Sequence, residues 1–262
     1  MLSFHELTRG LRQLGIEPNC PVIAHASLSA FEQVSGGAET LLGALLTCFT
    51  SVIMPTFTYK TMITPESGPP NNGIRYGSER DQNRMAEFYT PNMPADPSMG
   101  GVAETLRQHP NASRSMHPIL SFSGVNAGTV LQAQTLNQPL QPIHVLAGLG
   151  GWVLLLGVDH TTNTSIHYGE RVAGRKQFIR WALTPNGIIE CPGWPGCSDG
   201  FQAIAPHLEA VRRTAQAGSG LIQAFPLVEV VEAVIQAIAD DSHALLCNRP
   251  NCGRCNSVRG RQ

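Results

Sequence analysis

The chain has 262 residues, of which 42% are hydrophobic and 14% are charged, and its formal net charge is −1. This length allows one large domain or two small ones, and the composition is that of an ordinary globular protein. The charge balance excludes the basic face that nucleic-acid binding requires, so we expect no nucleic-acid partner.

No segment predicts contact with a membrane. The longest apolar stretch, residues 41–54, is interrupted by Thr47, Thr50 and Ser51 and is too short to span a bilayer. The N-terminal residues lack the apolar core of a signal peptide. We therefore expect a cytoplasmic protein without a membrane partner.

The first elements in chain order predict a parallel strand pair. Leu7, Leu11 and Leu14 have helical spacing and indicate an amphipathic N-terminal helix. The segments that follow are a buried strand, a helix and a second strand, at 21–25, 39–49 and 51–56. A strand–loop–helix–strand unit of this kind is typical of two parallel strands joined by a right-handed crossover.

Residues 59–98 differ from the segments on either side. They contain six prolines and several asparagines and show little periodicity. Loops of this length in compact domains are commonly functional or disordered. We expect a long loop or lid here.

The rest of the chain continues to alternate strands with helices. The expected elements are a helix at 100–108, strands at 119–122 and 151–158, a helix from Ser165, a hairpin of 176–183 with 187–191, and a helix at 228–239. This order predicts an α/β fold with a mixed central sheet flanked by helices. We expect a single domain over residues 1–262, with a loop or lid insertion near 59–98 and a cysteine-rich tail at 247–262.

The segment 154–170 carries the clearest chemistry. An apolar strand ends in a polar loop with His160, Asn163 and Thr164, and a helix begins with His167 and Glu170. The crevice beyond the carboxyl ends of strands is where α/β folds bind ligands. His167 and Glu170 are three residues apart and share a helix face, so the carboxylate can orient the imidazole as a general base. Taken alone, the pattern fits a structural histidine equally well.

Several ordered motifs resemble one known family, the aminoglycoside 3-N-acetyltransferases. The first is N-T-S-x-H-x-x-E, which occurs here at 163–170 after an apolar L-L-L-G-V run. The others are H-A-S-L at 25–28, where Ala26 departs from the family's serine, V-S-G-G-A-E at 34–39, M-P-T at 54–56, D-P-S-M-G at 96–100 with V-A-E-T-L-R at 102–107, and R-S-M-H-P at 114–118 with S-F at 121–122. The match covers roughly residues 20–260.

The resemblance implies direct acetyl transfer from acetyl-CoA to an amine of an aminoglycoside antibiotic, the 3-amino group, which confers resistance. It places the catalytic base at His167 with Glu170 as its partner. It also implies a fold like that of the antibiotic N-acetyltransferases. Whether the enzyme is a homodimer is left open.

Backbone and polar groups of the same motifs fit the acetyl-CoA donor. Free amides after a strand suit the thioester carbonyl, and a glycine turn before a helix suits a pyrophosphate. An ordinary strand–helix loop would also explain that glycine turn. His117 is equally compatible with a structural histidine held in place by Pro118. The expected donor-binding residues are Ser27, Leu28, Ser35, Gly36, Gly37, Arg114, Ser115, His117, Asn163 and Thr164.

An aminoglycoside is a polycation, so its pocket should carry carboxylates. The candidates for acceptor binding are Asp96, Asp159 and Asp199, besides Glu170. Exposed carboxylates are more often simply solvated, which is the competing interpretation for Asp159 and Asp199.

The C-terminal cysteines predict a structural zinc site. Cys252 and Cys255 form a Cys-x2-Cys pair, the common half of a tetrahedral thiolate site, and Cys247 lies just before them. We expect Cys197, in a turn, to be the fourth ligand, with Cys191 as the alternative. Free thiols on a tail are the competing interpretation.

Three alternative functions remain open at this point. The first is a CoA-dependent N-acetyltransferase that acts on a non-antibiotic amine. The second is a zinc hydrolase with His160, His167 and Glu170 as metal ligands, although His-x6-His-x2-Glu is not the usual arrangement. The third is a non-catalytic module that binds CoA or a protein.

Overall fold

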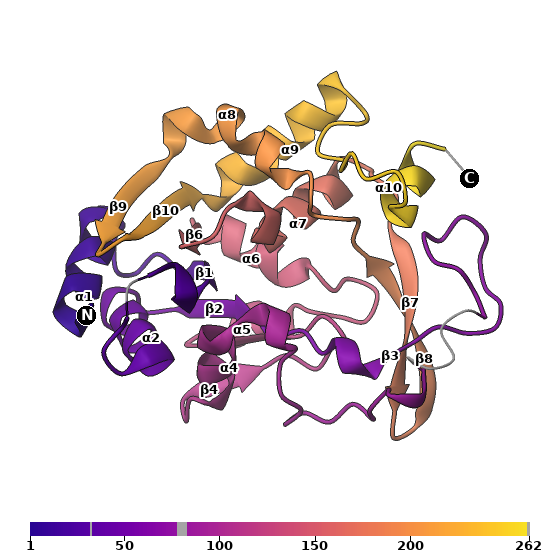
Figure 1. The fold of residues 1–262 in the computed structure, drawn as a ribbon, viewed down its shortest axis with the longest axis horizontal. Coiled ribbons are helices and arrows are strands. Elements are labelled where there is room, and N and C mark those ends of the chain that lie inside the picture. The colour runs from indigo at the N-terminus through magenta and orange to yellow at the C-terminus, as the bar shows by residue number, and fades with distance from the viewer. Residues whose placement is uncertain (32, 78–82, 261–262) are drawn as a thin grey trace.

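The computed structural model describes residues 1–31, 33–77 and 83–260 (Figure 1). Within them, seven strands form a mixed sheet in the order β4-β5-β2-β1-β6-β10-β9. These strands are β1 (Val22–Ala26), β2 (Val52–Pro55), β4 (Ala112–Arg114), β5 (Phe122–Val125), β6 (Trp152–Leu156), β9 (Arg213–Ala217) and β10 (Gly220–Pro226). A second sheet has the order β3-β7-β8 and consists of β3 (Met62–Ile63), β7 (Phe178–Thr184) and β8 (Gly187–Trp194).

The helices alternate with the strands along the chain. The α-helices are α1 (Phe4–Gln13), α2 (Gly37–Cys48), α4 (Gly101–Gln108), α5 (Gly128–Gln132), α6 (Gln141–Gly148), α7 (Thr164–Val172), α8 (Ala205–Leu208), α9 (Leu227–Asp240) and α10 (Gly253–Val258). Short 3-10 turns are η1 (Leu28–Ala30), η2 (Tyr59–Thr61), η3 (Pro97–Met99), η4 (His160–Thr162), η5 (Phe201–Ile204) and η6 (Glu209–Val211). No helix in the described ranges is long and apolar enough to cross a membrane.

The inner strands β1, β2, β5 and β6 of the large sheet are buried on both faces. Successive side chains of a strand point to opposite faces, so Val153 and Leu155 of β6 pack in one core and Leu154 and Leu156 in the other. Residues of α6, α7 and α9 complete the first core, and residues of α1, α2 and α4 complete the second. This double burial explains why β6 is almost entirely apolar in sequence.

The predicted mixed α/β fold is confirmed. Strand β1 pairs in parallel with both β2 and β6, whereas β5 and β10 pair antiparallel to their inner neighbours β2 and β6. The predicted parallel pair is therefore β1 with β2, and the predicted hairpin is β7 with β8. Figure 1 shows this hairpin and α10 at the opposite end of the molecule from α1.

The strand predicted at 119–122 was placed too early. The backbone N–H groups of Ile119 and Leu120 donate to Nδ1 of His117 at 3.1 and 2.9 Å, so this segment forms a turn. Strand β5 begins only at Phe122, opposite Pro55. The β9–β10 hairpin was not predicted.

The expected lid near 59–98 lies partly outside the described residues, because 78–82 are not among them. Its described part packs against the β7–β8 hairpin. Asn72 receives a hydrogen bond from the Ile179 amide at 2.9 Å and donates one to the Ile179 carbonyl at 3.0 Å. Tyr76 packs edge-on against Trp181.

Candidate active site

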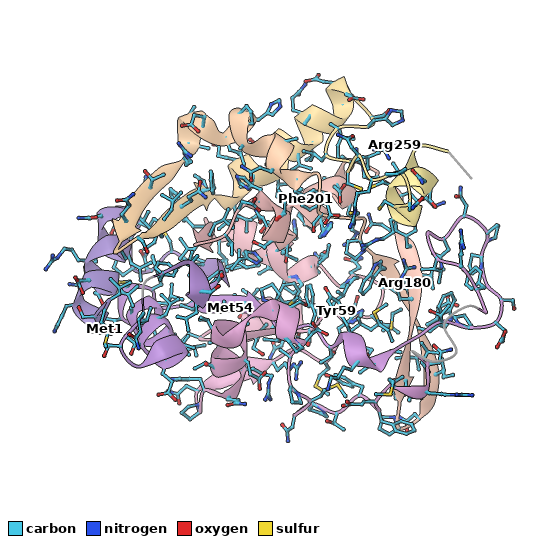
Figure 2. The ribbon with its side chains drawn as sticks, in the orientation of Figure 1. Met1, Met54, Tyr59, Arg180, Phe201 and Arg259 are labelled. Carbon is cyan, nitrogen blue, oxygen red and sulfur yellow. The ribbon has the colours of Figure 1, made fainter. Side chains whose placement is uncertain are left out.

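A cavity of about 690 Å³ opens at the carboxyl ends of β1 and β6. Because these strands are parallel neighbours, the loops that follow them meet at one edge of the sheet. Apolar side chains from β2, η2 and β8 complete the wall, and Figure 2 labels two of them, Met54 and Tyr59. The volume is in the range of small-molecule sites.

His167 faces this cavity from the first turns of α7. Its Nδ1 lies 3.0 Å from Oε2 of Glu170, and the side chains are 12% and 1% exposed. The carboxylate can only accept, so Nδ1 carries the proton and Nε2 is left as the basic nitrogen. The i, i+3 spacing that the sequence predicted therefore forms an oriented imidazole with one free nitrogen.

The second oxygen of the Glu170 carboxylate accepts a hydrogen bond from a buried arginine. Arg175 Nη1 donates to Glu170 Oε1 at 2.9 Å, and the same guanidinium donates to the carbonyls of Ala244 and Ser242 at 2.8 and 2.9 Å. Both side chains of this ion pair are at most 2% exposed. This buried ion pair holds the Glu170 carboxylate in place.

The loop after β8 covers the dyad from the other side. A Cβ built on Gly196 would lie 3.6 Å from Glu170 Oε2, and the Phe201 ring packs on His167 with centroids 4.6 Å apart. Figure 2 shows Phe201 close to the centre of the molecule. The dyad thus lies between this loop and the chain segment at 242–244.

Four of the predicted donor-binding residues line the cavity: Ser27, Leu28, Asn163 and Thr164. Asn163 caps α7, with its side-chain oxygen accepting from the Ser165 amide at 3.1 Å. Ser27 lies at the end of β1, where η1 begins.

Arg114, Ser115 and His117 do not line the cavity, so the structure does not bring them together with the other predicted donor-binding residues. The Arg114 guanidinium donates to the carbonyls of Thr56, Pro91 and Met93 and to the Ser121 hydroxyl. Burial lowers its pKa. With its donors used in this way, Arg114 ties loops together instead of facing a phosphate.

Ser115 and His117 hold the adjoining turn. The Ser115 hydroxyl accepts from the Phe122 amide at 2.8 Å, and His117 accepts two amides at Nδ1. Burial lowers the pKa of His117 to about 4, so its ring is neutral. These contacts fix the turn between β4 and β5.

Ser35 and Gly36 precede α2 and Gly37 is its first residue, so the predicted glycine turn leads into a helix, but these residues lie outside the cavity wall. Gly36 and Gly37 have φ of 77° and 61°, a conformation that glycine adopts most readily. A Cβ on Gly101, the first residue of α4, would lie 4.0 Å from Ala38. The amino ends of α2 and α4 therefore lie side by side at the rim, since Gly101 lines the cavity.

The three candidate aspartates have different positions. Asp199 lines the cavity and forms an ion pair with Arg249. Asp96 caps η3 through the Ser98 amide and hydroxyl, and Asp159 caps η4 through the Thr161 amide. Neither Asp96 nor Asp159 lines this cavity, because each serves as a local cap beside it.

Sequence reasoning missed part of the wall. Tyr59, Trp194 and Arg254 come from three distant segments, and all line the cavity. Burial raises the pKa of Tyr59 to about 12, which keeps the phenol neutral. No local signal could have found these residues, since only the second sheet and the C-terminal segment bring them there.

His25 also lines the cavity, whereas His160, in η4, is not part of its wall. Burial lowers the pKa of His25 to about 3, and nearby His160 adds to this; burial likewise lowers the pKa of His160 to about 4. His160 packs on Phe225 with centroids 4.8 Å apart. Among the described residues, the side chains that lie close enough together to bind one metal ion are four cysteines. His160, His167 and Glu170, the ligands expected for a zinc hydrolase, do not form such a cluster.

Four of the predicted cysteines do converge. The sulfurs of Cys197, Cys247, Cys252 and Cys255 all lie within 4.8 Å of one another. The alternative ligand Cys191 is not in this group, and burial in β8 raises its pKa to about 12. The structure therefore places Cys197, not Cys191, beside the C-terminal cysteines.

In this cavity a buried, ion-paired carboxylate orients a histidine of the wall, which is an arrangement that general-base catalysis can use. The family model described as aminoglycoside 3-N-acetyltransferase matches residues 23–239. The chain therefore belongs to the aminoglycoside 3-N-acetyltransferase family.

Individual relatives agree with this assignment. Aminoglycoside N(3)-acetyltransferase III from Salmonella is 28% identical over 250 residues, 84% of each chain. Aminoglycoside N(3)-acetyltransferase VII from Streptomyces paromomycinus is 33% identical over 183 residues, 66% of this chain and 62% of that one. The crystal structure of aminoglycoside acetyltransferase AAC(3)-IVa superimposes with a TM-score of 0.80 at 22% identity, covering 99% of this chain and 97% of that one.

Proposed function

We propose that this protein transfers the acetyl group of acetyl-CoA to the 3-amino group of an aminoglycoside antibiotic and so confers resistance. The observation that carries the proposal is the hydrogen bond between His167 Nδ1 and Glu170 at the wall of the cavity. It orients an imidazole whose second nitrogen can remove a proton from an attacking amine.

Solved relatives support this choice of substrates. One structure of the same fold is AAC-IIIb with CoASH, and another is an AAC(3)-IVa variant in complex with apramycin. The volume of about 690 Å³ suits an acceptor of this size together with the thioester end of the donor.

The chemical step uses the chain's own groups. His167 Nε2 takes a proton from the amine as its nitrogen attacks the thioester carbonyl. Glu170 stabilises the imidazolium that forms, and Arg175 keeps Glu170 ionised. The tetrahedral intermediate then expels the CoA thiolate, which can take the proton from His167, and leaves an amide. No acetyl-enzyme is formed, so the transfer is direct.

The donor lies along Ser27, Leu28, Asn163 and Thr164. The backbone at the start of η1 holds the thioester carbonyl, where hydrogen-bond donors stabilise the developing oxyanion. The adjacent amino ends of α2 and α4, with Ser35, Gly36 and Gly37, are the proposed position of the pyrophosphate, because helix amino ends attract anions.

The acceptor contacts Asp199 and the aromatic wall of Tyr59 and Trp194. A polycation gains from a carboxylate in the cavity, and aromatic faces suit sugar rings and ammonium groups. Tyr59 belongs to the described part of the 59–98 segment, and its place in the cavity wall supports a role of that segment as a lid. The lid and the rest of residues 1–262 form a single domain. Because acetyl-CoA is an intracellular metabolite, we place the activity in the cytoplasm.

The four cysteine thiolates bind a structural zinc ion. Four sulfurs at the zinc–sulfur distance of about 2.3 Å are about 3.8 Å apart, which is compatible with sulfurs that all lie within 4.8 Å. A site closed by four thiolates leaves no position for substrate, so the ion takes no part in acetyl transfer.

The test is CoA release from acetyl-CoA in the presence of a panel of aminoglycosides, with mass spectrometry of each product. One added acetyl group, placed on the 3-amino nitrogen by NMR, is the expected result. CoA binding without acetylation of any member would overturn the antibiotic as acceptor and leave another amine as the substrate.

A further inference from the structure

The C-terminal segment 242–258 contacts the large core through Leu245, with Ala244 and Val258 packed against the same core. Between these contacts, Cys247 and Cys255 form a separate buried cluster with Cys197, and Leu246 and Cys252 pack beside it. The buried members of this cluster are all cysteines, and a bound metal is a usual source of stability for such a cluster.

The local backbone sets the cysteines up as ligands. Cys252 is the N-cap residue of α10 and Cys255 lies in the first turn, so the two sulfurs share one side of the helix. Cys247 and Cys197 approach from two other chain segments. A metal ion bound by ligands from separate chain segments cross-links those segments.

Three arginines surround the cluster. Arg249 Nη2 lies 3.6 Å from the Cys197 sulfur, Arg259 Nη2 donates to the Cys247 carbonyl at 2.6 Å, and Arg254 Nη1 donates to the Gly196 carbonyl at 2.9 Å. Zinc with four thiolates carries a net charge of −2, which cations at this distance stabilise. Four neutral thiols would offer these cations no such charge.

The residues that flank the ligands are those that fix the catalytic pair. On one side of Cys197, Gly196 lies against Glu170, and on the other Phe201 packs on His167. Before Cys247, the carbonyls of Ser242 and Ala244 hold Arg175, which holds Glu170. The metal ligands therefore lie in both chain segments that enclose the dyad.

We propose that zinc bound by Cys197, Cys247, Cys252 and Cys255 clamps the 194–201 loop to the C-terminal segment, and that this clamp positions Glu170 and His167 for acetyl transfer. The catalytic part of this inference rests on the proposed function. The four cysteines are ligands, and Gly196 and Arg175 are the positioning groups through which they act. Loss of the ion loosens the dyad without touching the donor site at Ser27 and Leu28.

The first measurement is the zinc content of the purified enzyme by mass spectrometry. We expect about one zinc per chain in the wild type and in C20S, whose substituted thiol is remote from the cluster, and little zinc in C252S. Replacement by Co²⁺ should give the absorption of a tetrahedral tetrathiolate. A wild-type enzyme with four free thiols or two disulfides and no metal would overturn the site.

The second measurement separates positioning from general stability. In C252S, or in wild type stripped by a chelator, the downfield NMR signal of the His167 Nδ1 proton should disappear while the circular dichroism of the fold is retained. Turnover should fall about 10²-fold, the typical cost of a small misplacement, while the Kd for CoA stays at the wild-type value. Zinc added back to the stripped enzyme should restore both the signal and turnover.

The outcomes separate this inference from the proposed function. Metal-free, folded C252S with an intact His167 signal and wild-type turnover would overturn the clamp. If no aminoglycoside is acetylated, yet zinc removal still abolishes the NMR signal, the proposed acceptor fails and the clamp stands. Should C252S fail to fold, stripping and reloading the wild type gives the same test.

Discussion

Two polar segments of this protein carry the same kinds of side chain and have opposite roles. Arg114, Ser115 and His117 direct their polar groups to backbone amides, carbonyls and a neighbouring hydroxyl around β4 and β5. His167 uses Nδ1 for Glu170 and lines the cavity. The comparison teaches that the same residue types differ in whether they face the cavity, and this position, not the residue type, makes His167 the proposed base.

Of the substitutions that test this comparison, His167→Ala should have the largest effect on turnover. We expect kcat to fall about 10²–10⁴-fold because the general base is lost, while the Kd for CoA is unchanged. Steady-state kinetics and calorimetry measure the two quantities, and His207→Ala, at an exposed histidine of α8, is the control. A variant with near wild-type turnover would remove His167 from the mechanism.

Glu170→Gln should lower kcat by about 10–10³-fold, because an amide cannot stabilise the imidazolium as a carboxylate does. It also leaves the buried Arg175 without its carboxylate, so the melting temperature must be measured alongside. Glu209→Gln, at an exposed ion pair with Arg212, is the matched control. Unchanged kcat in a folded Glu170→Gln variant would contradict the dyad.

Arg114→Met tests the other segment. The change leaves the carbonyls of Thr56 and Met93 without their donor, so we expect a loss of about 2–4 kcal/mol in the free energy of unfolding. The KM for acetyl-CoA should stay within about twofold, since no phosphate contact is lost. A stable variant with a tenfold higher KM for acetyl-CoA would show that Arg114 does contribute to donor binding.

His117 predicts a dependence of stability on pH. Its folded pKa of about 4 lies below the ordinary value of 6.5, so between these limits the unfolded state binds the proton and the folded state does not. Stability should therefore fall with decreasing pH, by up to about 1.4 kcal/mol per pH unit for this histidine. Urea unfolding of wild type and His117→Asn at pH 7.5 and 5 measures it. The variant's pH dependence should be flatter, and an equal slope in both proteins would refute the assignment.

Asp199→Asn should have the smallest effect. The carboxylate is 45% exposed and already paired with Arg249, so we expect the KM for an aminoglycoside to rise only about 2–5-fold. The effect should shrink as salt concentration increases, because exposed charges are screened. An unchanged KM at low salt would remove Asp199 from acceptor binding.

Much of the fold followed from the sequence alone. The apolar run of β6, the β1–α2–β2 unit and the Thr-Pro-Asn-Gly hairpin are local patterns, and local patterns report strand and helix periods directly. His167 and Glu170 could be paired in advance because three residues of helix fix their distance. Cys252 and Cys255 could be paired because Cys-x2-Cys is the common half of a tetrahedral thiolate site.

Tertiary structure decided what no local pattern contains. The cavity wall draws Tyr59, Trp194 and Arg254 from segments far apart in the chain, and Cys197 rather than Cys191 meets the C-terminal cysteines. Arg114 and His117 have polar partners that the folded loops supply. Sequence spacing determined the contacts within one helix or hairpin, and the long-range packing of the two sheets determined which polar groups were left to face a substrate.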